Sequence, residues 1–324
     1  MKLLQDVLAQ VGSPLRDVEE GIRTAFDDAS HEARRINAHL AQSGGKRIRP
    51  ILTLMSAKLF TDDLERAIPV GIAAEMIHMA TLVHDDVIDG ASTRRGNATV
   101  NHLWGNHTSV LAGDALLAKA LVILVDKTTP EIVRLMADMV YKMCEGEIAQ
   151  HATLHDLHQS EEEYFQRIEK KTALFFAACC KAGALMGGAT AEQADALWAY
   201  GRHLGMAFQV VDDLLDVCAE EQVVGKPVGH DLESGVLTLP VLRLLEEEGR
   251  SGAAAKILAK GAKMTRSDVE RVLAMVRENG AVEYAYGVAE RFSNEAKAAL
   301  QPIPPSETKD LLLHVADTVL TRRF

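Results

Sequence analysis

Residues 82–96 read LVHDDVIDGASTRRG and set three aspartates, Asp85, Asp86 and Asp89, at the end of an apolar helical pattern that stops at Gly90. A helix C-terminus carries partial negative charge, so acidic side chains there cost stability. Like charges four residues apart in a helix cost about a few tenths of a kcal/mol more. Bound cations would compensate for this cost, and the stretch therefore indicates a functional site at a helix end.

Residues 205–221, GMAFQVVDDLLDVCAEE, repeat the aspartate spacing late in a second apolar helical pattern. Spacings of four and seven residues are close to whole helical turns, so each motif gathers polar side chains on one face. The first face carries His78, Asp85 and Asp89, with Asp86 one step away, and the second carries Gln209, Asp213 and Asp216, with Asp212 one turn before Asp216. One triplet would be compatible with a solvated helix end, but two copies with core-like neighbours predict carboxylates that face a cavity.

Helical periods recur along the whole chain, whereas aromatic residues make up only 5% of it and alternating strand patterns are nearly absent. The expected helices cover residues 15–42, 50–60, 67–89, 108–126, 130–150, 161–187, 191–219, 236–247, 267–279 and 281–300. Turn signals such as SGGKRIRP, DGASTRRGN and QPIPP separate many of them. The sequence predicts an all-α fold of about ten helices. No linker divides the chain, so we expect one large domain, residues 1–324.

Composition excludes several classes of protein. The net charge of −11 and the pI of about 5.6 argue against non-specific binding to nucleic acid. The four cysteines contain no CxxC pair, which predicts reduced thiols. Residues 1–20 carry charges throughout and lack a signal-peptide core, and the apolar run 172–189 contains Lys181 and three glycines. That run is therefore interpreted as a buried helix, and a cytoplasmic protein is expected.

Carboxylates crowded in this way need cations. Oxygen-only clusters outside a glycine-containing calcium loop suit Mg²⁺, which keeps several waters and bridges to phosphates. Zinc is disfavoured, because no cysteine and only one nearby histidine have the required spacing. The two motifs therefore predict a Mg²⁺-dependent site for phosphorylated substrates.

Basic residues supply the matching positive charge. The stretch GGKRIRP puts Lys46, Arg47 and Arg49 in a glycine-opened turn before a helix, where backbone N–H groups also favour anions. Further candidates are Arg94 and Arg95 after the first motif, Lys171 in KKTA and Lys226 in VGKP. Two diphosphates at about −3 each and six aspartates sum to about −12, which about three Mg²⁺ and six basic side chains (46, 49, 94, 95, 171 and 226) would balance.

At these residues the sequence resembles the trans-type (E)-polyprenyl diphosphate synthases. The resemblance covers essentially the whole chain and rests on GGKRIRP, LVHDDVIDGASTRRG, GE at 146–147, KT at 171–172, FQVVDDLLD and GKPVGHDLESGVLTLP. Within the family it is strongest to medium- and long-chain members, especially the large catalytic subunit of bacterial heptaprenyl diphosphate synthases. The resemblance implies a helical bundle of the isoprenoid synthase type around a central cavity, usually in a dimer.

The resemblance also implies a role for each matching residue. Mg²⁺ on the allylic diphosphate would be bound by Asp85, Asp86 and Asp89, with Asp212, Asp213 and Asp216 from the second motif. The allylic diphosphate would contact Arg94, Lys171 and Lys226, and isopentenyl diphosphate would contact Lys46, Arg49, His78 and Arg95. Thr172 and Gln209 would line the reacting centre. Ala98 stands where the family often has proline, which would loosen the loop without removing a charge.

The implied reaction begins when the allylic C–O bond ionises to a carbocation. The double bond of isopentenyl diphosphate attacks this carbocation, and a proton is then lost to the departing diphosphate. Product length would be set in the helical turn before Asp85, where Ala80 and Thr81 are small and shorter-chain members place an aromatic residue at the position of Ala80. The tunnel should therefore stay open to roughly thirty to fifty carbons, with the heptaprenyl product as first choice.

Other functions share part of this pattern. A class I terpene cyclase has the first motif but mixes Asn, Ser and Glu in the second, and a phosphohydrolase of the HD type, suggested by HDD at 84–86, needs more histidine ligands. A non-catalytic subunit that binds prenyl diphosphates should have lost some of these aspartates or basic residues. Octaprenyl, decaprenyl and geranylgeranyl synthases remain alternatives. The sequence leaves open a homodimer or a heterodimer with a small subunit, and the product would pass to a membrane as a quinone side chain.

Overall fold

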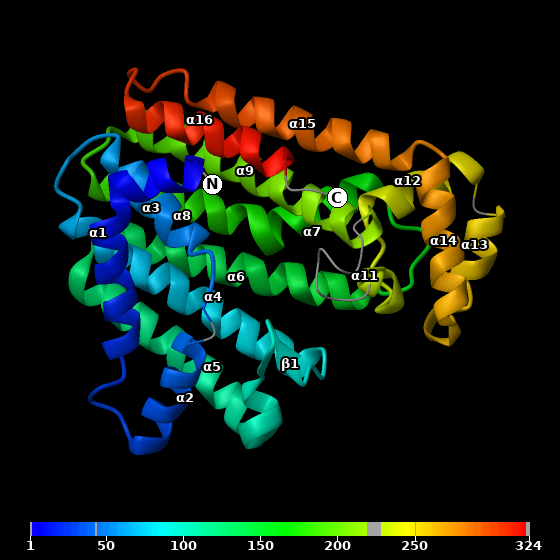
Figure 1. Ribbon diagram of the computed structural model, residues 1–324, viewed down its shortest axis with the longest axis horizontal. Helices are drawn as coiled ribbons and strands as arrows, with labels where there is room; N and C mark the ends of the chain where they lie inside the picture. The colour runs from blue at the N-terminus through cyan, green and yellow to red at the C-terminus, as the bar shows by residue number, and fades with distance from the viewer. Residues whose placement is uncertain (1, 43, 219–227, 250, 322–324) are drawn as a thin grey trace. The chain divides into compact units, whose positions relative to one another are not determined.

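The computed structural model describes residues 2–42, 44–218, 228–249 and 251–321, and it is helical almost throughout (Figure 1). The first elements are α1 (Lys2–Thr24), α2 (His31–Gln42), α3 (Ile48–Lys58), η1 (Glu65–Ala67), α4 (Ile68–Ile88), β1 (Thr93–Arg94), β2 (Asn97–Ala98), α5 (Val100–Lys127) and α6 (Pro130–Ala152). The next are α7 (Glu161–Ile168), η2 (Glu169–Ala173), α8 (Leu174–Met186), α9 (Ala191–Cys218), α11 (His230–Glu233) and α12 (Leu239–Glu248). The last are α13 (Ala253–Leu258), η3 (Gly261–Lys263), α14 (Arg266–Glu278), α15 (Ala281–Ala299) and α16 (Glu307–Leu320). The predicted all-α fold is confirmed.

The chain falls into two compact units. Unit 1 comprises residues 1–137, 178–197 and 306–308, and unit 2 comprises residues 138–177, 198–305 and 309–324. Four of the five boundaries lie inside helices, in α6, α8, α9 and α16, rather than in linkers. The single domain expected from the sequence stays a prediction.

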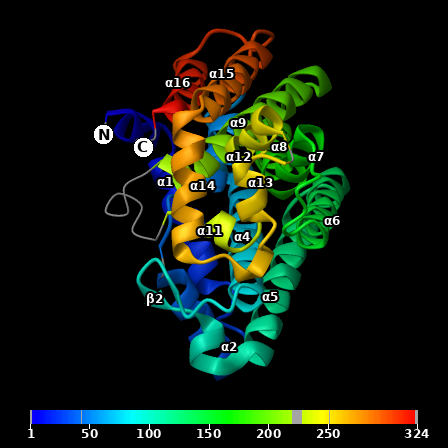
Figure 2. The same cartoon turned by 90° about the vertical axis from the view of Figure 1, so that its right-hand side faces the viewer.

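Unit 1 is organised around α4, which contacts α1, α3 and α5. Figures 1 and 2 both show α4 beside α5. The buried side of α4 is lined with small and apolar residues such as Ala73, Ala74, Met76 and Ile77, none of which exposes any surface. Burial of these side chains stabilises the helix by about 25 cal/mol per Å² of apolar surface and so fixes the helix that carries the first aspartate motif.

Unit 2 packs α9 closely against the segment that joins α7 to α8. A Cβ atom added at Gly201 would lie 2.6 Å from the Phe176 carbonyl oxygen, and one added at Gly205 would lie 2.5 Å from the Ala173 Cα atom. Only glycine allows two backbones to approach so closely. The second aspartate motif follows Gly205 on the same helix. The close contact therefore fixes the position of this motif relative to the segment that carries Lys171 and Thr172.

Some predicted boundaries were wrong. The helix expected over 15–42 is two helices, because residues 25–30 turn through local bonds such as Ala29 N to the Phe26 carbonyl oxygen. The expected helix 161–187 contains a π-helical turn, η2. The short helices α11 and α13 and the hairpin of β1 and β2 were not expected, because brief elements leave a weak periodic signal. The 14-residue helix α16 was also not expected.

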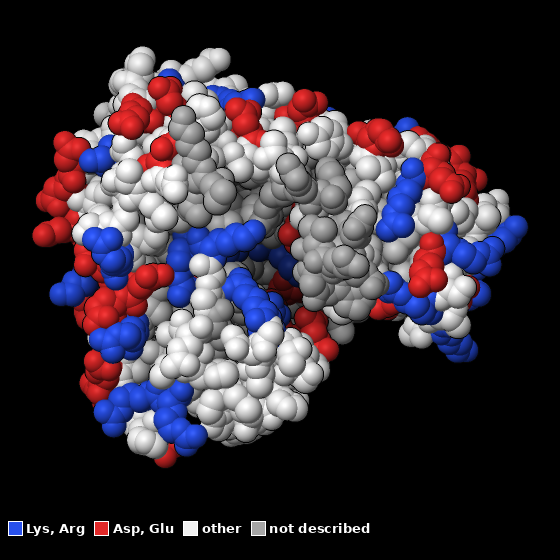
Figure 3. All heavy atoms as spheres, viewed as in Figure 1, with Lys and Arg blue, Asp and Glu red and all other residues white. Residues whose placement is uncertain are grey.

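Two helices of the described chain are long and apolar enough to cross a membrane by length and composition alone, Glu65–Ile88 and Val100–Lys127. Of their most apolar windows, 61% is buried in the first and only 28% in the second. A core helix passes the same test, so this is weak support for a membrane span. Figure 3 shows an uncharged area where Figure 1 places the start of α5, and residues 96–113 contain no Lys, Arg, Asp or Glu.

Candidate active site

The residues predicted to form the site fall into two sets, one in each unit. Unit 1 holds Lys46, Arg49, His78, Ala80, Thr81, Asp85, Asp86, Asp89, Arg94 and Arg95, and unit 2 holds Lys171, Thr172, Gln209, Asp212, Asp213 and Asp216. Lys226 lies outside the described residues. Each set is a local arrangement of side chains.

A pocket of unit 1 gathers four residues of the first set, His78, Asp86, Arg94 and Arg95. Its lining residues include His39, Gly44, Arg47, Glu75, His78, Asp86, Arg94, Arg95 and Thr99. The pocket thus brings Gly44 and Arg47 of the GGKRIRP turn beside Asp86 of the first aspartate motif and the two arginines that follow it. A concave site with three guanidinium groups at its wall suits a compact anion such as a diphosphate.

Two arginines of this pocket hold a backbone conformation that is unusual for any residue other than glycine. Arg47 has φ 50° and Arg95 has φ 52°, both in the left-handed region. The Arg95 Nη1 atom donates a hydrogen bond of 2.6 Å to the Gly44 carbonyl oxygen, so the two loops that carry these arginines are tied together. Such conformations cost about 1–3 kcal/mol each and occur most often where function requires them.

Glu75 is the acidic partner of the GGKRIRP turn. The Arg47 Nη1 atom lies 2.8 Å from the Glu75 Oε1 atom, and the two side chains are only 11% and 5% exposed. Removal of one member of a buried pair leaves the other uncompensated, at a cost of about 3–5 kcal/mol. The pair therefore anchors the turn to α4, one helical turn before His78.

His78 remains neutral in this surrounding. Burial and the charges of Arg49, Arg95, Arg94 and Arg47 lower the pKa of His78 to about 2. A neutral imidazole has one N–H donor and one acceptor, so it can contribute a hydrogen bond but no positive charge. The prediction that His78 belongs to the diphosphate pocket is consistent with its position, and the charge must come from the arginines.

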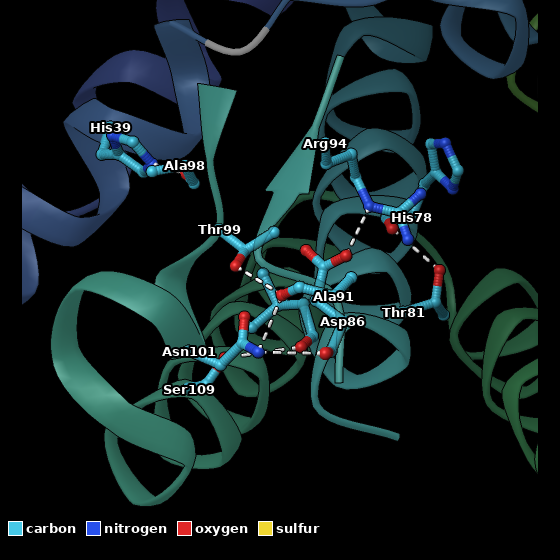
Figure 4. Close-up of polar contacts among 11 residues, drawn as sticks. His39, His78, Thr81, Asp86, Ala91, Arg94, Ala98, Thr99, Asn101 and Ser109 are labelled. Carbon is cyan, nitrogen blue, oxygen red and sulfur yellow. Dashed lines mark hydrogen bonds and ion pairs between the residues drawn. The ribbon is translucent and has the colours of Figure 1, made fainter. Parts of the chain in front are cut away.

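The first aspartate motif lies at the end of α4, as predicted. Asp85 and Asp86 occupy the last turn and Asp89 caps the helix. The Arg94 Nε atom donates a 2.7 Å hydrogen bond to the Asp86 Oδ1 atom (Figure 4). Burial raises the pKa of Asp86, and the bond from Arg94 opposes that rise. Asp85 is half-buried and Asp89 is exposed.

Hydrogen bonds from side chains to backbone carbonyl oxygens hold the loop after this motif (Figure 4). The Asn101 amide donates to the carbonyl oxygens of Asp86 and Ala91 at 3.1 and 3.0 Å. The Thr99 hydroxyl also donates to Ala91 at 2.8 Å, and a ring nitrogen of His39 lies 2.8 Å from the Ala98 carbonyl oxygen. The loop is therefore fixed in this structure with alanine in place of the family proline.

His84 has a structural role in unit 1. Its Nε2 atom lies 3.2 Å from the Val110 carbonyl oxygen and 3.5 Å from an oxygen of Asp114. A Cβ atom at Gly113 would occupy the position of the imidazole ring, so this glycine makes room for it. His84 thus packs and hydrogen-bonds within unit 1, and HDD at 84–86 does not by itself indicate a phosphohydrolase.

In unit 2 the predicted residues Lys171 and Thr172 lie in the π-helical turn η2. The Lys171 Nζ atom is 2.8 Å from an oxygen of Glu147. The Arg202 guanidinium donates two hydrogen bonds, of 2.7 and 3.0 Å, to the two oxygens of Glu169. This bidentate pair holds the π-helical turn η2 against α9. Single π turns inside α-helices occur frequently at functional sites because they rotate side chains out of register.

The second aspartate motif is held by neutral donors. Asp213 accepts a 2.7 Å hydrogen bond from the Tyr164 hydroxyl and a 2.8 Å bond from the Gln209 amide. Burial and the nearby Asp231 carboxylate raise the pKa of Asp213, and these two bonds oppose the rise. Asp216 accepts backbone N–H bonds from the start of α11 at 3.2 and 3.1 Å. Asp212 is exposed.

The donor set fits the metal predicted from the sequence. Among the residues that the structure describes, no three carboxylate, imidazole or thiol groups form a complete metal cage. Mg²⁺ commonly takes one or two protein carboxylates and completes its shell with waters and substrate phosphates. Each unit offers carboxylate oxygens of this kind, unit 1 at Asp85, Asp86 and Asp89 and unit 2 at Asp212, Asp213 and Asp216, and these residues are the candidate ligands.

Several residues of these networks could not be assigned from the sequence. Glu75, Tyr164 and Arg202 have common residue types and no motif around them. Glu75 precedes His78 by three residues, which places both on neighbouring parts of one helix face. That spacing was a usable signal for Glu75, whereas Tyr164 and Arg202 lie far along the chain from their partners.

Comparisons with known proteins agree with this arrangement. Residues 30–276 match the polyprenyl synthetase family. Heptaprenyl diphosphate synthase component 2 from Geobacillus stearothermophilus is 36% identical over 313 residues and covers 97% of each chain. A short chain isoprenyl diphosphate synthase from Methanothermobacter thermautotrophicus is 38% identical over 309 residues, which cover 94% of this chain and 95% of the relative. A solved structure of polyprenyl synthase from Caulobacter crescentus CB15, complexed with calcium and isoprenyl diphosphate, has a TM-score of 0.92 and 32% identity and covers 99% of this chain and 98% of that one.

The fold, the two aspartate motifs and the arginine pocket define a helical enzyme that transfers prenyl groups between diphosphates. The chain belongs to the polyprenyl synthetase family and is a prenyltransferase. The family resemblance stated from the sequence is therefore confirmed. The two relatives named above differ in product class, so likeness alone leaves the product length undecided.

The neutral state of His78 predicts a specific acid sensitivity. The unfolded chain protonates this histidine below about pH 6.5, whereas the folded chain keeps it neutral, so stability falls as the pH falls through this range. Between pH 7.5 and pH 5 the loss from this one group should be about 2 kcal/mol. His78→Gln should abolish that part of the loss, as measured by urea unfolding at both pH values without substrates. His107→Gln, at an exposed site, is the control and should retain the loss; equal pH dependence of the His78 variant and the wild type would contradict the assignment.

Proposed function

We propose that the chain is a Mg²⁺-dependent synthase that condenses isopentenyl diphosphate with an allylic diphosphate such as farnesyl diphosphate. The product would be an all-trans polyprenyl diphosphate, with heptaprenyl as first choice, for a quinone side chain. The observation that carries the proposal is the pocket of unit 1, in which Arg94, Arg95 and Arg47 surround neutral His78 beside the Asp86 carboxylate. The enzyme would act in the cytoplasm and pass its apolar product to a membrane.

Isopentenyl diphosphate would be held in this pocket. Arg95 lines the pocket and would supply positive charge, to which we expect Lys46 and Arg49, the residues on either side of Arg47 and Ile48, to add, and neutral His78 would supply a hydrogen bond. Arg47 is already paired with Glu75, so its role is to hold the turn in place. A substrate held in place near the reacting centre reacts faster, because its translational and rotational entropy is already lost when it binds and no longer adds to the barrier.

The allylic diphosphate would be the leaving group. Bound Mg²⁺ would neutralise the negative charge that grows on it. Asp85, Asp86 and Asp89, together with Asp212, Asp213 and Asp216, are the proposed ligands. Arg94, Lys171 and Lys226 would contact the same diphosphate, and Thr172 and Gln209 would face the carbocation. Apolar side chains would keep water away from that cation.

The test is an assay of the chain expressed alone, with labelled isopentenyl diphosphate, farnesyl diphosphate and Mg²⁺. A long prenyl product extractable into butanol is expected, and chromatography of the product gives its length. Asp85→Ala should lower turnover by about a hundredfold or more, because it removes a metal ligand at the charge that develops in the transition state. A cyclic hydrocarbon or free phosphate as main product would overturn the proposal.

The thermal stability of the Asp85→Ala variant without metal is the control for folding. Removal of one carboxylate relieves repulsion at a helix C-terminus, so the melting temperature should stay level or rise. A large fall would show that Asp85 holds the fold, and the loss of turnover would then say nothing about metal. Alternative products in the same assay are octaprenyl, decaprenyl and geranylgeranyl diphosphate.

Product length should depend on the helical turn before Asp85. Ala80 is 3% exposed, and the Thr81 hydroxyl donates a 2.8 Å hydrogen bond back to the His78 carbonyl oxygen (Figure 4). Both side chains are small and leave the turn without a bulky group. Each isoprene unit buries several CH₂-sized groups at about 0.8 kcal/mol apiece, which favours elongation until a barrier is met.

Ala80→Phe should therefore shorten the product. The ring would obstruct the descending chain, and the main product should contain about fifteen to twenty carbons, as length scales with the apolar space that remains. Ala80→Val is the graded control and should give an intermediate length. An unchanged product distribution in an active and folded Ala80→Phe variant would show that Ala80 does not line the tunnel.

We also propose that the active form is a homodimer. Exposed apolar residues recur on α5 with alternating spacings of four and three, at Leu111, Ala115, Ala118, Val122 and Val125. Leu111, Val122 and Val125 are 56, 51 and 62% exposed. Apolar residues at this spacing form the contact stripe by which two helices pair in a coiled coil. The α5 helices of two copies could pack against each other through this stripe. A relative is named as component 2 of its enzyme, so a heterodimer with a small subunit is the alternative outcome.

Val122→Glu should convert the dimer to a monomer, because two copies would bring like charges together in an apolar seam. Light scattering of the purified protein measures the mass directly. Leu8→Glu, on an exposed apolar residue of α1, is the matched control and should leave the mass unchanged. A wild-type chain with the mass of one copy would reject the homodimer, and activity gained only with a small second protein would favour the heterodimer.

A further inference from the structure

A chain of three hydrogen bonds joins Tyr164 to Thr172 inside unit 2. The Tyr164 hydroxyl donates to the Asp213 Oδ2 atom at 2.7 Å, and the Gln209 Nε2 atom donates to the Asp213 Oδ1 atom at 2.8 Å. The Thr172 hydroxyl then donates to the Gln209 Oε1 atom at 2.7 Å. Tyr164 is completely buried, and Asp213 and Thr172 are 4% and 7% exposed.

The donors and acceptors fix the direction of each hydrogen bond in this network. The phenol and the amide N–H both donate to Asp213, so the Gln209 amide oxygen is the group left to accept from Thr172. The reverse orientation of Gln209 would place its carbonyl oxygen against the Asp213 carboxylate, which has no proton to offer when ionised. Thr172 therefore uses its only proton within the protein, and the lone pairs of its oxygen remain available.

The Tyr164 end of the chain is fixed by its own neighbours. A capping box of Ser160 and Glu163 starts α7 just before Tyr164. The Arg167 guanidinium lies 5.4 Å from the centre of the Tyr164 ring and donates hydrogen bonds to the Gln159 side chain and the Leu237 carbonyl oxygen at 2.8 and 2.6 Å. The phenol is thus held in one place and aimed at one oxygen.

We propose that Tyr164 is a positioning residue of the prenyl transfer. It holds Asp213 so that Gln209 and Thr172 present oxygen lone pairs, rather than N–H or O–H groups, to the carbocation. This inference rests on the proposed place of Thr172 and Gln209 at the reacting centre. Dipoles oriented before the reaction stabilise a developing charge without the cost of reorganisation, so the orientation of these two oxygens affects turnover more than substrate binding.

Loss of the phenol hydroxyl would release the far end of the chain. One buried oxygen of Asp213 would lack its donor, and the Gln209 amide could then turn to supply it. A buried polar atom left without its partner is costly, so the amide has a strong reason to move. The Thr172 hydroxyl would in turn be free to donate elsewhere, and its proton could point at the cation.

The first variant is Tyr164→Phe, which keeps the buried ring and removes only the hydroxyl. The kcat should fall about tenfold while the KM values for both substrates change little, as expected for an interaction made in the transition state. Tyr200→Phe is the matched control, because Tyr200 is also completely buried in unit 2 and its hydroxyl donates a 2.8 Å bond to the Leu312 carbonyl oxygen. This control should lose similar thermal stability but keep its kcat within about twofold.

A double-mutant cycle separates positioning from a general structural role. Thr172→Val should lower kcat by itself, and Tyr164→Phe added to it should have a smaller effect than in the wild type, because one of the two groups on which Tyr164 acts is gone. An unchanged kcat in Tyr164→Phe alone, or effects of the two substitutions that multiply, would overturn the inference. A normal kcat in Thr172→Val would instead remove Thr172 from the reacting centre and so refute the proposed function of that residue as well.

Discussion

Mutual repulsion among four guanidinium groups is the constraint on which the arginine-rich part of unit 1 depends. Arg47, Arg49, Arg94 and Arg95 all lie close enough to lower the pKa of His78. Two of them have buried acidic partners, Glu75 for Arg47 and Asp86 for Arg94, at 2.8 and 2.7 Å. These pairs permit the other positive charges to remain together, since a buried charge without compensation costs several kcal/mol. The pocket lined by Arg47, Arg94 and Arg95 therefore suits an anion.

The carboxylates of the second aspartate motif, in unit 2, are held in a different way. Asp213 and Asp216 are held by neutral donors: a phenol, an amide and backbone N–H groups. Neutral donors fix the orientation of a carboxylate without cancelling its charge. The pocket of unit 1 is therefore lined by three arginines, whereas Asp213 and Asp216 of unit 2 are oriented by neutral groups.

Several residues of the candidate site depart from regular backbone geometry, although His155, which also has positive φ, lies outside it. Arg47 and Arg95 have positive φ, and Lys171 and Thr172 lie in a π-helical turn. Each departure is held by contacts that are individually strong, such as the fork between Arg202 and Glu169. Strain that persists in this way marks positions where the direction of a side chain matters more than local stability.

The sequence by itself determined the all-α fold, the two aspartate motifs and the family. Helical periods and motifs such as GGKRIRP are encoded by neighbouring residues, so their geometry follows from spacing alone. Only the tertiary structure showed that Arg47 pairs with Glu75 and that Tyr164 bonds to Asp213. These partners lie 28 and 49 residues apart, and a lone glutamate or tyrosine has no local pattern that reveals what it will meet. Packing brings them together, because the burial of apolar helix faces decides which distant segments become neighbours, and hydrogen bonds then select among the polar groups left inside.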